Sequence, residues 1–230
     1  MRRRILLLPM LLSAAAAPAL GVPYWVSYEG NDYPENEGWE RSFSDENGVG
    51  QGGSERSLDG GVLTLDSMRD PQISDNYRVS RQINPDPGEL FVAEWRLRVL
   101  DAVGPLRDVG VTIARDGMGT VSFRYGLDHV QGVEEDWTYD LEPLEFHAFR
   151  VESPDMVNYS LWIDGMFVRD GMWHLQSLNE SYFFFGDAVR GAGVLSNSQW
   201  DYVRFGVVPE PGSPWILATG WILFARRNLR

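Results

Sequence analysis

The 230-residue sequence contains no cysteine and no lysine, so all 20 of its basic residues are arginine. Without cysteine the protein cannot form disulfides, thiolate metal sites or a cysteine nucleophile. The arginines are outnumbered by 33 aspartates and glutamates, which gives a formal net charge of -13. A nucleic-acid partner is therefore not expected, because its phosphates would find no basic face to bind.

Long amphipathic helix patterns are also missing, since no segment of more than about ten residues repeats its apolar side chains with helical spacing. The composition is nevertheless that of a folded chain, with 43% hydrophobic and 13% aromatic residues. The 24 glycines and 13 prolines indicate many turns. Together these features predict a single all-β domain with a large core.

The N-terminus is typical of a secretory signal peptide. Three arginines at positions 2–4 precede an apolar segment at residues 5–12 and a run of small residues at 14–19. The apolar segment is too short for a permanent membrane span, which needs about 20 residues. We predict a signal peptide at residues 1–22, with an uncleaved N-terminal anchor as the alternative.

The C-terminus carries a second targeting pattern. Three features follow one another there: Pro209-Glu210-Pro211, the apolar segment 215–225 and the basic pair Arg226-Arg227. The prolines end the preceding strand, and the arginine pair would keep the tail on the cytoplasmic side of a membrane.

This order of features resembles the PEP-CTERM sorting signal of bacteria, over residues 208–230. The resemblance implies processing by an exosortase, a membrane protease, in a Gram-negative bacterium that makes extracellular polysaccharide. It also implies an exported protein that is transiently anchored in the inner membrane and then reaches the cell surface or the medium. The eleven apolar residues are few beside the usual ~20, so a terminal amphipathic or core-capping helix is the alternative.

The central residues, 23–207, show alternating hydrophobicity typical of antiparallel strands. Residues 23–60 predict an edge strand followed by long loops. Further strands are predicted at 62–65, 77–83, 90–100, 109–113, 121–125, 146–152, 158–164, 166–169, 181–185 and 200–207. In the strand at 90–100 the alternation points one set of side chains to the core: Phe91, Ala93, Trp95, Leu97 and Val99.

Two stretches resemble the concanavalin A-like (laminin G-like) β-sandwich. Residues 146–152 form an aromatic-rich strand, and the next strand ends in Asp164-Gly165, a hairpin turn sequence. Residues 199–205 resemble the last strand of that fold, which pairs beside the first. The resemblance implies an antiparallel jelly-roll sandwich whose relatives include lectins and glucanases.

Catalytic carboxylates are the first chemistry to consider on such a fold. Laminarinase-like enzymes place them on one strand in the pattern Glu-x-Asp-x-x-Glu, and this sequence lacks it. Residues 134–136 are acidic, but Tyr139 stands where an acid would be needed, so we predict a solvated loop there. The three histidines, His129, His147 and His174, are widely separated and lie in no motif for a metal or a catalytic triad.

Calcium is a candidate cofactor, because concanavalin A-like domains often hold it in loops at a sheet edge. The carboxylates predicted at turns or strand ends are Asp164, Asp170, Asp187 and Asp201. Solvated surface acids explain the same positions equally well, so the sequence defines no ligand set.

Polysaccharide is the candidate partner. Sugars stack on exposed aromatic rings, and the nine tryptophans include several in predicted loops or on outer faces. We name Trp137, Trp162 and Trp173 as candidate carbohydrate-binding residues, although core packing is the commoner role of a tryptophan in a sandwich. The sequence therefore favours a non-enzymatic glycan-binding or matrix domain. A glycoside hydrolase or lyase and a purely structural surface protein are the alternatives.

Overall fold

The computed structural model describes residues 24–42, 55–68, 78–83, 85, 89–103, 109–175, 180–187 and 195–208. Within these ranges the chain forms two antiparallel sheets and one short 3₁₀ helix, η1 (Pro34–Glu37). The predicted helices at both termini lie outside the described residues. The predicted all-β antiparallel sandwich is confirmed.

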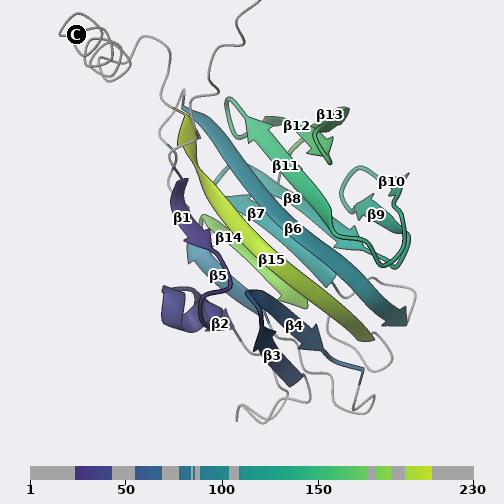
Figure 1. Ribbon diagram of the computed structural model, residues 1–230. Helices are drawn as coiled ribbons and strands as arrows, with labels where there is room; N and C mark the ends of the chain where they lie inside the picture. Colours follow the sequence, from purple (N-terminus) through teal and green to yellow (C-terminus); the bar gives the residue numbers. More distant parts are fainter. Residues whose placement is uncertain are drawn as a thin grey trace, which may run out of the picture.

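The eight-stranded sheet has the order β13 (Met166–Met172), β12 (Asn158–Ile163), β11 (His147–Ser153), β6 (Leu90–Val103), β15 (Leu195–Val208), β4 (Val62–Asp66) and β3 (Glu55–Asp59), with β1 (Tyr24–Tyr28) also paired to β15. The seven-stranded sheet has the order β10 (Trp137–Asp140), β9 (His129–Gly132), β8 (Gly119–Tyr125), β7 (Val109–Arg115), β14 (Tyr182–Asp187), β5 (Arg78–Gln82) and β2 (Glu40–Ser42). In Figure 1 the sheet containing β15, β6 and β11 lies in front of the one containing β14, β7 and β8.

The strand pairings agree with the sequence predictions at several points. The closing strand β15 pairs with the first strand β1, as the family resemblance implied. All five side chains predicted to point inward from β6 are buried. Asp164 and Gly165 both have positive φ, as a two-residue hairpin turn requires, and Gly supplies this conformation without strain.

Aromatic rings from both sheets fill the space between them. Trp95 of β6 stacks on Phe149 of β11 with ring centroids 5.9 Å apart, and it also contacts Phe123 and Phe183 of the opposite sheet. The Trp95 indole Nε1 donates a hydrogen bond of 2.7 Å to the hydroxyl of Tyr125, which lies on β8. Each sheet is thus bonded to the other through buried side chains.

The acidic residues 134–136 were predicted to form a solvated loop; they do form a turn, and Asp136 is exposed, but Glu134 and Glu135 are half-buried. They form the turn between β9 and β10, two strands that the sequence did not predict. Glu134 accepts hydrogen bonds from the Ser122 backbone N–H (2.8 Å) and the Thr120 hydroxyl (3.3 Å). It therefore covers the outer face of β8, and this explains why Ser122 is buried although its strand phase points outward.

Glu135 joins the two sheets at one end of the sandwich. Its carboxylate accepts hydrogen bonds from the Tyr159 hydroxyl (2.6 Å) and the Met172 backbone N–H (2.8 Å), and it pairs with Arg169 at 3.2 Å. These partners belong to β12 and β13 of the eight-stranded sheet. Burial and this carboxylate raise the pKa of Tyr159, which keeps its hydroxyl protonated and able to donate.

The buried Tyr159 ring passes directly over Gly171. A Cβ atom at Gly171 would lie 2.4 Å from the Tyr159 Cζ atom, closer than any real contact. We therefore expect Gly171→Ala to destabilise the protein by about 1–3 kcal/mol, the usual cost of overpacking, in urea unfolding. The penalty should shrink sharply in a Tyr159→Leu background, and an equal penalty in both backgrounds would contradict this packing.

Asp155 closes the turn before β12. Its Oδ1 accepts hydrogen bonds from the backbone N–H groups of Val157 (2.8 Å) and Asn158 (2.7 Å). Partial burial by itself would raise the pKa of Asp155, but the hydrogen bonds from Asn158 and Val157 outweigh it and lower the pKa below its usual range. The charged carboxylate is therefore favoured in the folded state.

A lowered pKa in the folded state means that this stabilisation is present at neutral pH and is lost as the pH falls through the folded value. We expect Asp155→Ala to lower the free energy of unfolding by about 1 kcal/mol at pH 7, and by progressively less below pH ~4. Asp155→Asn is the matched control, because it keeps the Oδ1 acceptor without the charge. If Asp155→Ala lowered the free energy of unfolding by the same amount at neutral and at acid pH, the charged carboxylate would not be the stabilising form of Asp155.

Candidate functional site

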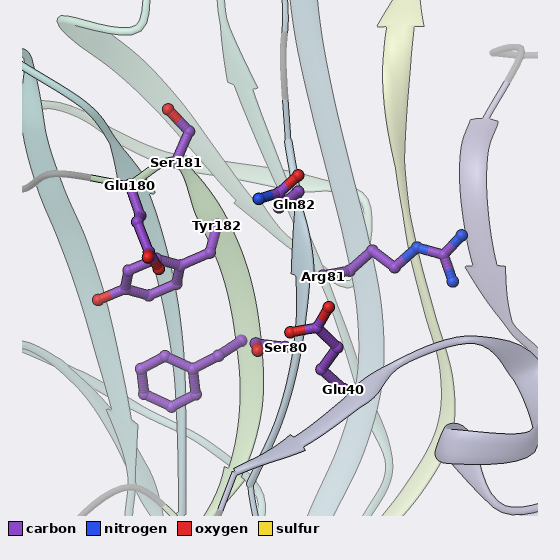
Figure 2. Close-up of a pocket in the computed structure, with 8 residues that line it drawn as sticks. Glu40, Ser80, Arg81, Gln82, Glu180, Ser181 and Tyr182 are labelled. Carbon is purple, nitrogen blue, oxygen red and sulfur yellow. The ribbon is translucent and has the colours of Figure 1, made fainter.

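The candidate site is a groove on the outer face of the seven-stranded sheet. It has a volume of about 310 Å³ and lies where β14, β5 and β2 are neighbours. Eight residues line it, drawn in Figure 2: Glu40, Ser80, Arg81, Gln82, Glu180, Ser181, Tyr182 and Phe184.

Strand alternation explains why these side chains face the groove. In β14, Phe183 and Phe185 are fully buried between the sheets, so Tyr182 and Phe184 point to the outer face. In β5, Val79 is the buried residue and Ser80 points outward, directly opposite Phe184 in the register. The core thus determines which residues are presented outside.

The two outer rings of β14 form a stacked pair. The ring centroids of Tyr182 and Phe184 are 6.2 Å apart and their planes differ by 30°. Phe184 is buried, whereas Tyr182 is partly exposed, so Tyr182 is the member of the pair that is accessible from the groove. A flat aromatic surface of this kind suits the C–H face of a sugar ring.

Polar groups surround the aromatic pair. Figure 2 shows Glu180 on the same side as Tyr182, with Ser80 and Glu40 across the groove. Arg81 points away from these side chains and donates to the backbone carbonyls of residues 37 and 38. The carboxylates of Glu40 and Glu180 therefore dominate the charge of the groove.

The central strands of this sheet carry no acid on their outer faces. The outward-facing residues of β7 and β8 are Gly110, Thr112, Ala114, Thr120, Ser122 and Arg124. A pair of catalytic carboxylates on one strand, as in the laminarinase pattern, is therefore absent from β7 and β8. The two acids of the groove come instead from separate segments, β2 and the residues before β14.

The three predicted tryptophans are not brought together. Trp173 is 3% exposed and packs in the core, so it offers no ring face to a surface ligand. Trp137 is partly buried against Phe123 and is covered by the Arg169 guanidinium at 5.0 Å. Trp162 is half-buried on the eight-stranded sheet, on the opposite side of the sandwich from the groove.

Neither Tyr182 nor Glu40 was among the sequence candidates. The strand at 181–185 has aromatic residues in both phases, so alternation alone does not say which rings lie outside. That pattern could nevertheless have pointed to the site. Aromatic rings in both phases of a strand place at least one ring on its outer face, where it either binds a ligand or is covered by another segment.

The predicted calcium carboxylates also lie apart. Asp164, in the β12–β13 turn, is hydrogen-bonded to His147 of β11 (2.7 Å), and Asp201 pairs with Arg96 (2.6 Å). Asp170 accepts from Ser160, while Asp187 is fully buried beside Ser196. Among the described residues, no three His, Asp or Glu side chains gather closely enough to hold a metal ion.

The sorting motif, Pro209-Glu210-Pro211 with Arg226 and Arg227, lies outside the described residues. In the part of the chain that the structure describes, no helix has the length and hydropathy needed to cross a membrane.

No protein-family model and no curated protein sequence matches the chain. Solved structures do, and three of them are glucan-degrading enzymes with a TM-score of 0.54. The chain is 15% identical to the endo-β-1,3-glucanase of Pyrococcus furiosus, over 80% of this chain and 94% of that one. It is 15% identical to the endo-1,3-β-glucanase of Streptomyces sioyaensis, over 84% and 98%.

The laminarinase of Flavobacterium sp. UMI-01 is 10% identical, over 79% of this chain and 99% of that one. A sialidase is also similar, with a TM-score of 0.50 and 14% identity over 72% of this chain, which spans only 18% of that enzyme's length. Identities this low establish a shared fold. The chain has the concanavalin A-like jelly-roll sandwich of these glucanases.

Proposed function

We propose that this protein binds a glycan in the groove beside Tyr182, without cleaving it. The stacked pair Tyr182–Phe184, edged by carboxylate, amide and hydroxyl groups, is the observation that carries the proposal. Ligand sites commonly combine such an apolar surface with a few placed polar groups. The fold shared with three glucan-degrading enzymes supports the same substrate class.

The charge of the groove selects among glycans. Glu40 and Glu180 would repel carboxylate or sulfate groups on a polysaccharide, while their oxygens accept hydrogen bonds from sugar hydroxyls. The formal net charge of -13 would also repel an anionic polysaccharide at longer range. The proposed ligand is therefore a neutral polysaccharide.

The remaining parts of the proposal rest on the sequence. Residues 1–22 would direct export, residues 23–207 would form the binding domain, and residues 208–230 would be read by an exosortase. The mature domain would then act at the cell surface or in the extracellular polysaccharide.

Tyr182→Ala is expected to weaken binding to an immobilised neutral glucan by about tenfold or more, which corresponds to roughly 1.4 kcal/mol. Loss of the accessible ring removes the stacking surface and leaves the core rings of β14 in place. Affinity electrophoresis of the full-length protein through gels containing laminarin or other neutral polysaccharides would measure this loss of affinity.

Tyr33→Ala is the matched control, because this half-buried tyrosine lies in the segment before η1 and lines no part of the groove. Equal retardation of the wild type and Tyr182→Ala would exclude this groove as the binding site. No retardation of the wild type by any glycan would instead favour a purely structural surface protein.

A glycoside hydrolase is the second candidate, since two carboxylates line one groove. Retaining and inverting enzymes need their two acids roughly 5–9.5 Å apart around the scissile bond. Because the central strands lack the laminarinase acids, we expect no new reducing ends from laminarin, measured by a reducing-sugar assay. Reducing ends that form with wild type and disappear in both Glu40→Gln and Glu180→Gln would establish the hydrolase instead.

A further inference from the structure

A second groove lies on the outer face of the eight-stranded sheet, on the side of the sandwich away from Tyr182. Its volume is about 400 Å³. It crosses β12, β11, β6 and β15, which are consecutive neighbours in the sheet. The residues that matter for its chemistry are Glu94, Ala148, Arg150, Glu152, Trp162 and Tyr202.

Both aromatic walls of this groove stand at irregularities of the sheet. The pairing of β15 with β6 shifts register between Trp200 and Tyr202, and the pairing of β12 with β13 shifts between Leu161 and Trp162. A β-bulge can re-aim a side chain, and bulges are over-represented next to active sites. The extra residue of the second shift, Val168, lies on β13, so β12 keeps its regular alternation and Trp162 faces outward with Ser160. The sheet thus departs from regular pairing at the two positions that carry the rings.

The β15 bulge has a visible consequence. Trp200 is fully buried in the core, whereas the next two residues, Asp201 and Tyr202, both lie on the outer surface. Regular alternation would have put one of them inside. The Arg204 guanidinium then covers one face of the Tyr202 ring at 4.2 Å and is itself held by two hydrogen bonds to Glu29 (2.7 and 2.6 Å).

Trp162 is supported in a comparable way. Phe167, which is 57% exposed, packs edge-on against it with ring centroids 5.8 Å apart. Since Trp162 and Tyr202 lie three strand spacings apart, their strands are separated by about 14 Å. The two rings therefore flank an extended channel, long enough for a chain of sugars rather than one ring.

The floor of the channel is polar and held in place. Arg150 donates to the carboxylates of Glu94 and Glu152, with an Nε–Oε1 distance of 2.7 Å to Glu152. Small Ala148 lies beside them and leaves space above the sheet. Burial, and next the charge of Glu94, raise the pKa of Tyr202, so its hydroxyl remains a donor at neutral pH.

We propose that this channel is a second binding site for a neutral glycan chain, which makes each domain bivalent. The two carboxylates and one guanidinium along the floor leave one negative charge, so an anionic chain would be repelled here as well. Because the two grooves face outward from opposite sheets, one molecule joins two separate polysaccharide chains. This inference rests on the proposed glycan binding and gives it a physical role as a matrix cross-linker.

Titration of the full-length protein with laminarihexaose, a neutral β-1,3-glucan oligosaccharide, counts the sites by calorimetry. We expect two ligands per chain for wild type, and one for either Trp162→Ala or Tyr182→Ala. Trp162→Phe should retain the second ligand, because it keeps a stacking face. Mixing with laminarin polymer should raise light scattering for the wild type and for neither single variant, since cross-linking needs both grooves.

The outcomes separate the two proposals. One ligand per wild-type chain, lost in Tyr182→Ala and unchanged in Trp162→Ala, would overturn the second site and keep the proposed function. One ligand lost only in Trp162→Ala would place binding in the channel and overturn both bivalency and the role of Tyr182. No binding of laminarihexaose, or of any neutral oligosaccharide in a panel, would overturn both proposals.

Tyr202→Ala tests whether the effect of Trp162→Ala comes from misfolding. It removes the ring on the other side of the channel, on β15, and should also cost the second ligand. Unfolding midpoints in urea identify any variant that is globally destabilised. Tyr33→Ala shows the effect of truncating a tyrosine that packs against the core but lines neither groove. A Tyr202→Ala protein that folds normally and keeps two ligands would contradict the channel as drawn.

Discussion

Contact between aromatic rings of the two sheets is the constraint on which the rest of this structure depends. The chain has no cysteine, so no disulfide ties one sheet to the other. Trp95 does this instead, since it stacks on Phe149 within its own sheet, contacts rings of the opposite sheet and donates a buried hydrogen bond to Tyr125. An apolar core of this size excludes water from that bond, and an unsatisfied indole or hydroxyl there would be costly.

That core determines what the outer faces can present. Because side chains alternate along a strand, burial of Phe183 and Phe185 obliges Tyr182 to face outward. The opposite sheet reaches the same result in two ways, because regular alternation in β12 places Trp162 outside and the register shift in β15 places Tyr202 outside. Regular alternation thus builds the first groove, whereas the second combines a regularly alternating strand, β12, with an interrupted one, β15. Both grooves combine rings with carboxylates, and this shared chemistry is the basis for proposing an uncharged ligand at each.

Some acidic side chains of this protein have a structural role, because they accept hydrogen bonds within the sandwich. Glu134 covers the outer face of β8, and Glu135 bonds the β9–β10 turn to the opposite sheet. Such carboxylates accept several hydrogen bonds at once, including bonds from backbone N–H groups that would otherwise be unpaired. Part of the acid excess therefore helps to close the sandwich.

The sequence by itself determined the fold class, most strand positions, the inward face of β6 and the Asp164-Gly165 turn, because these depend on local alternation and turn chemistry. It missed β2, β3, β9 and β10, where short strands carry too few apolar residues to show a period. Only the tertiary structure decided that Trp173 is buried, that Glu40 and Tyr182 line one groove, and that a bulge brings Tyr202 to the same face as Trp162. Those facts depend on strand register and on contacts between segments that are distant in sequence. The local alternation of apolar and polar residues specifies neither.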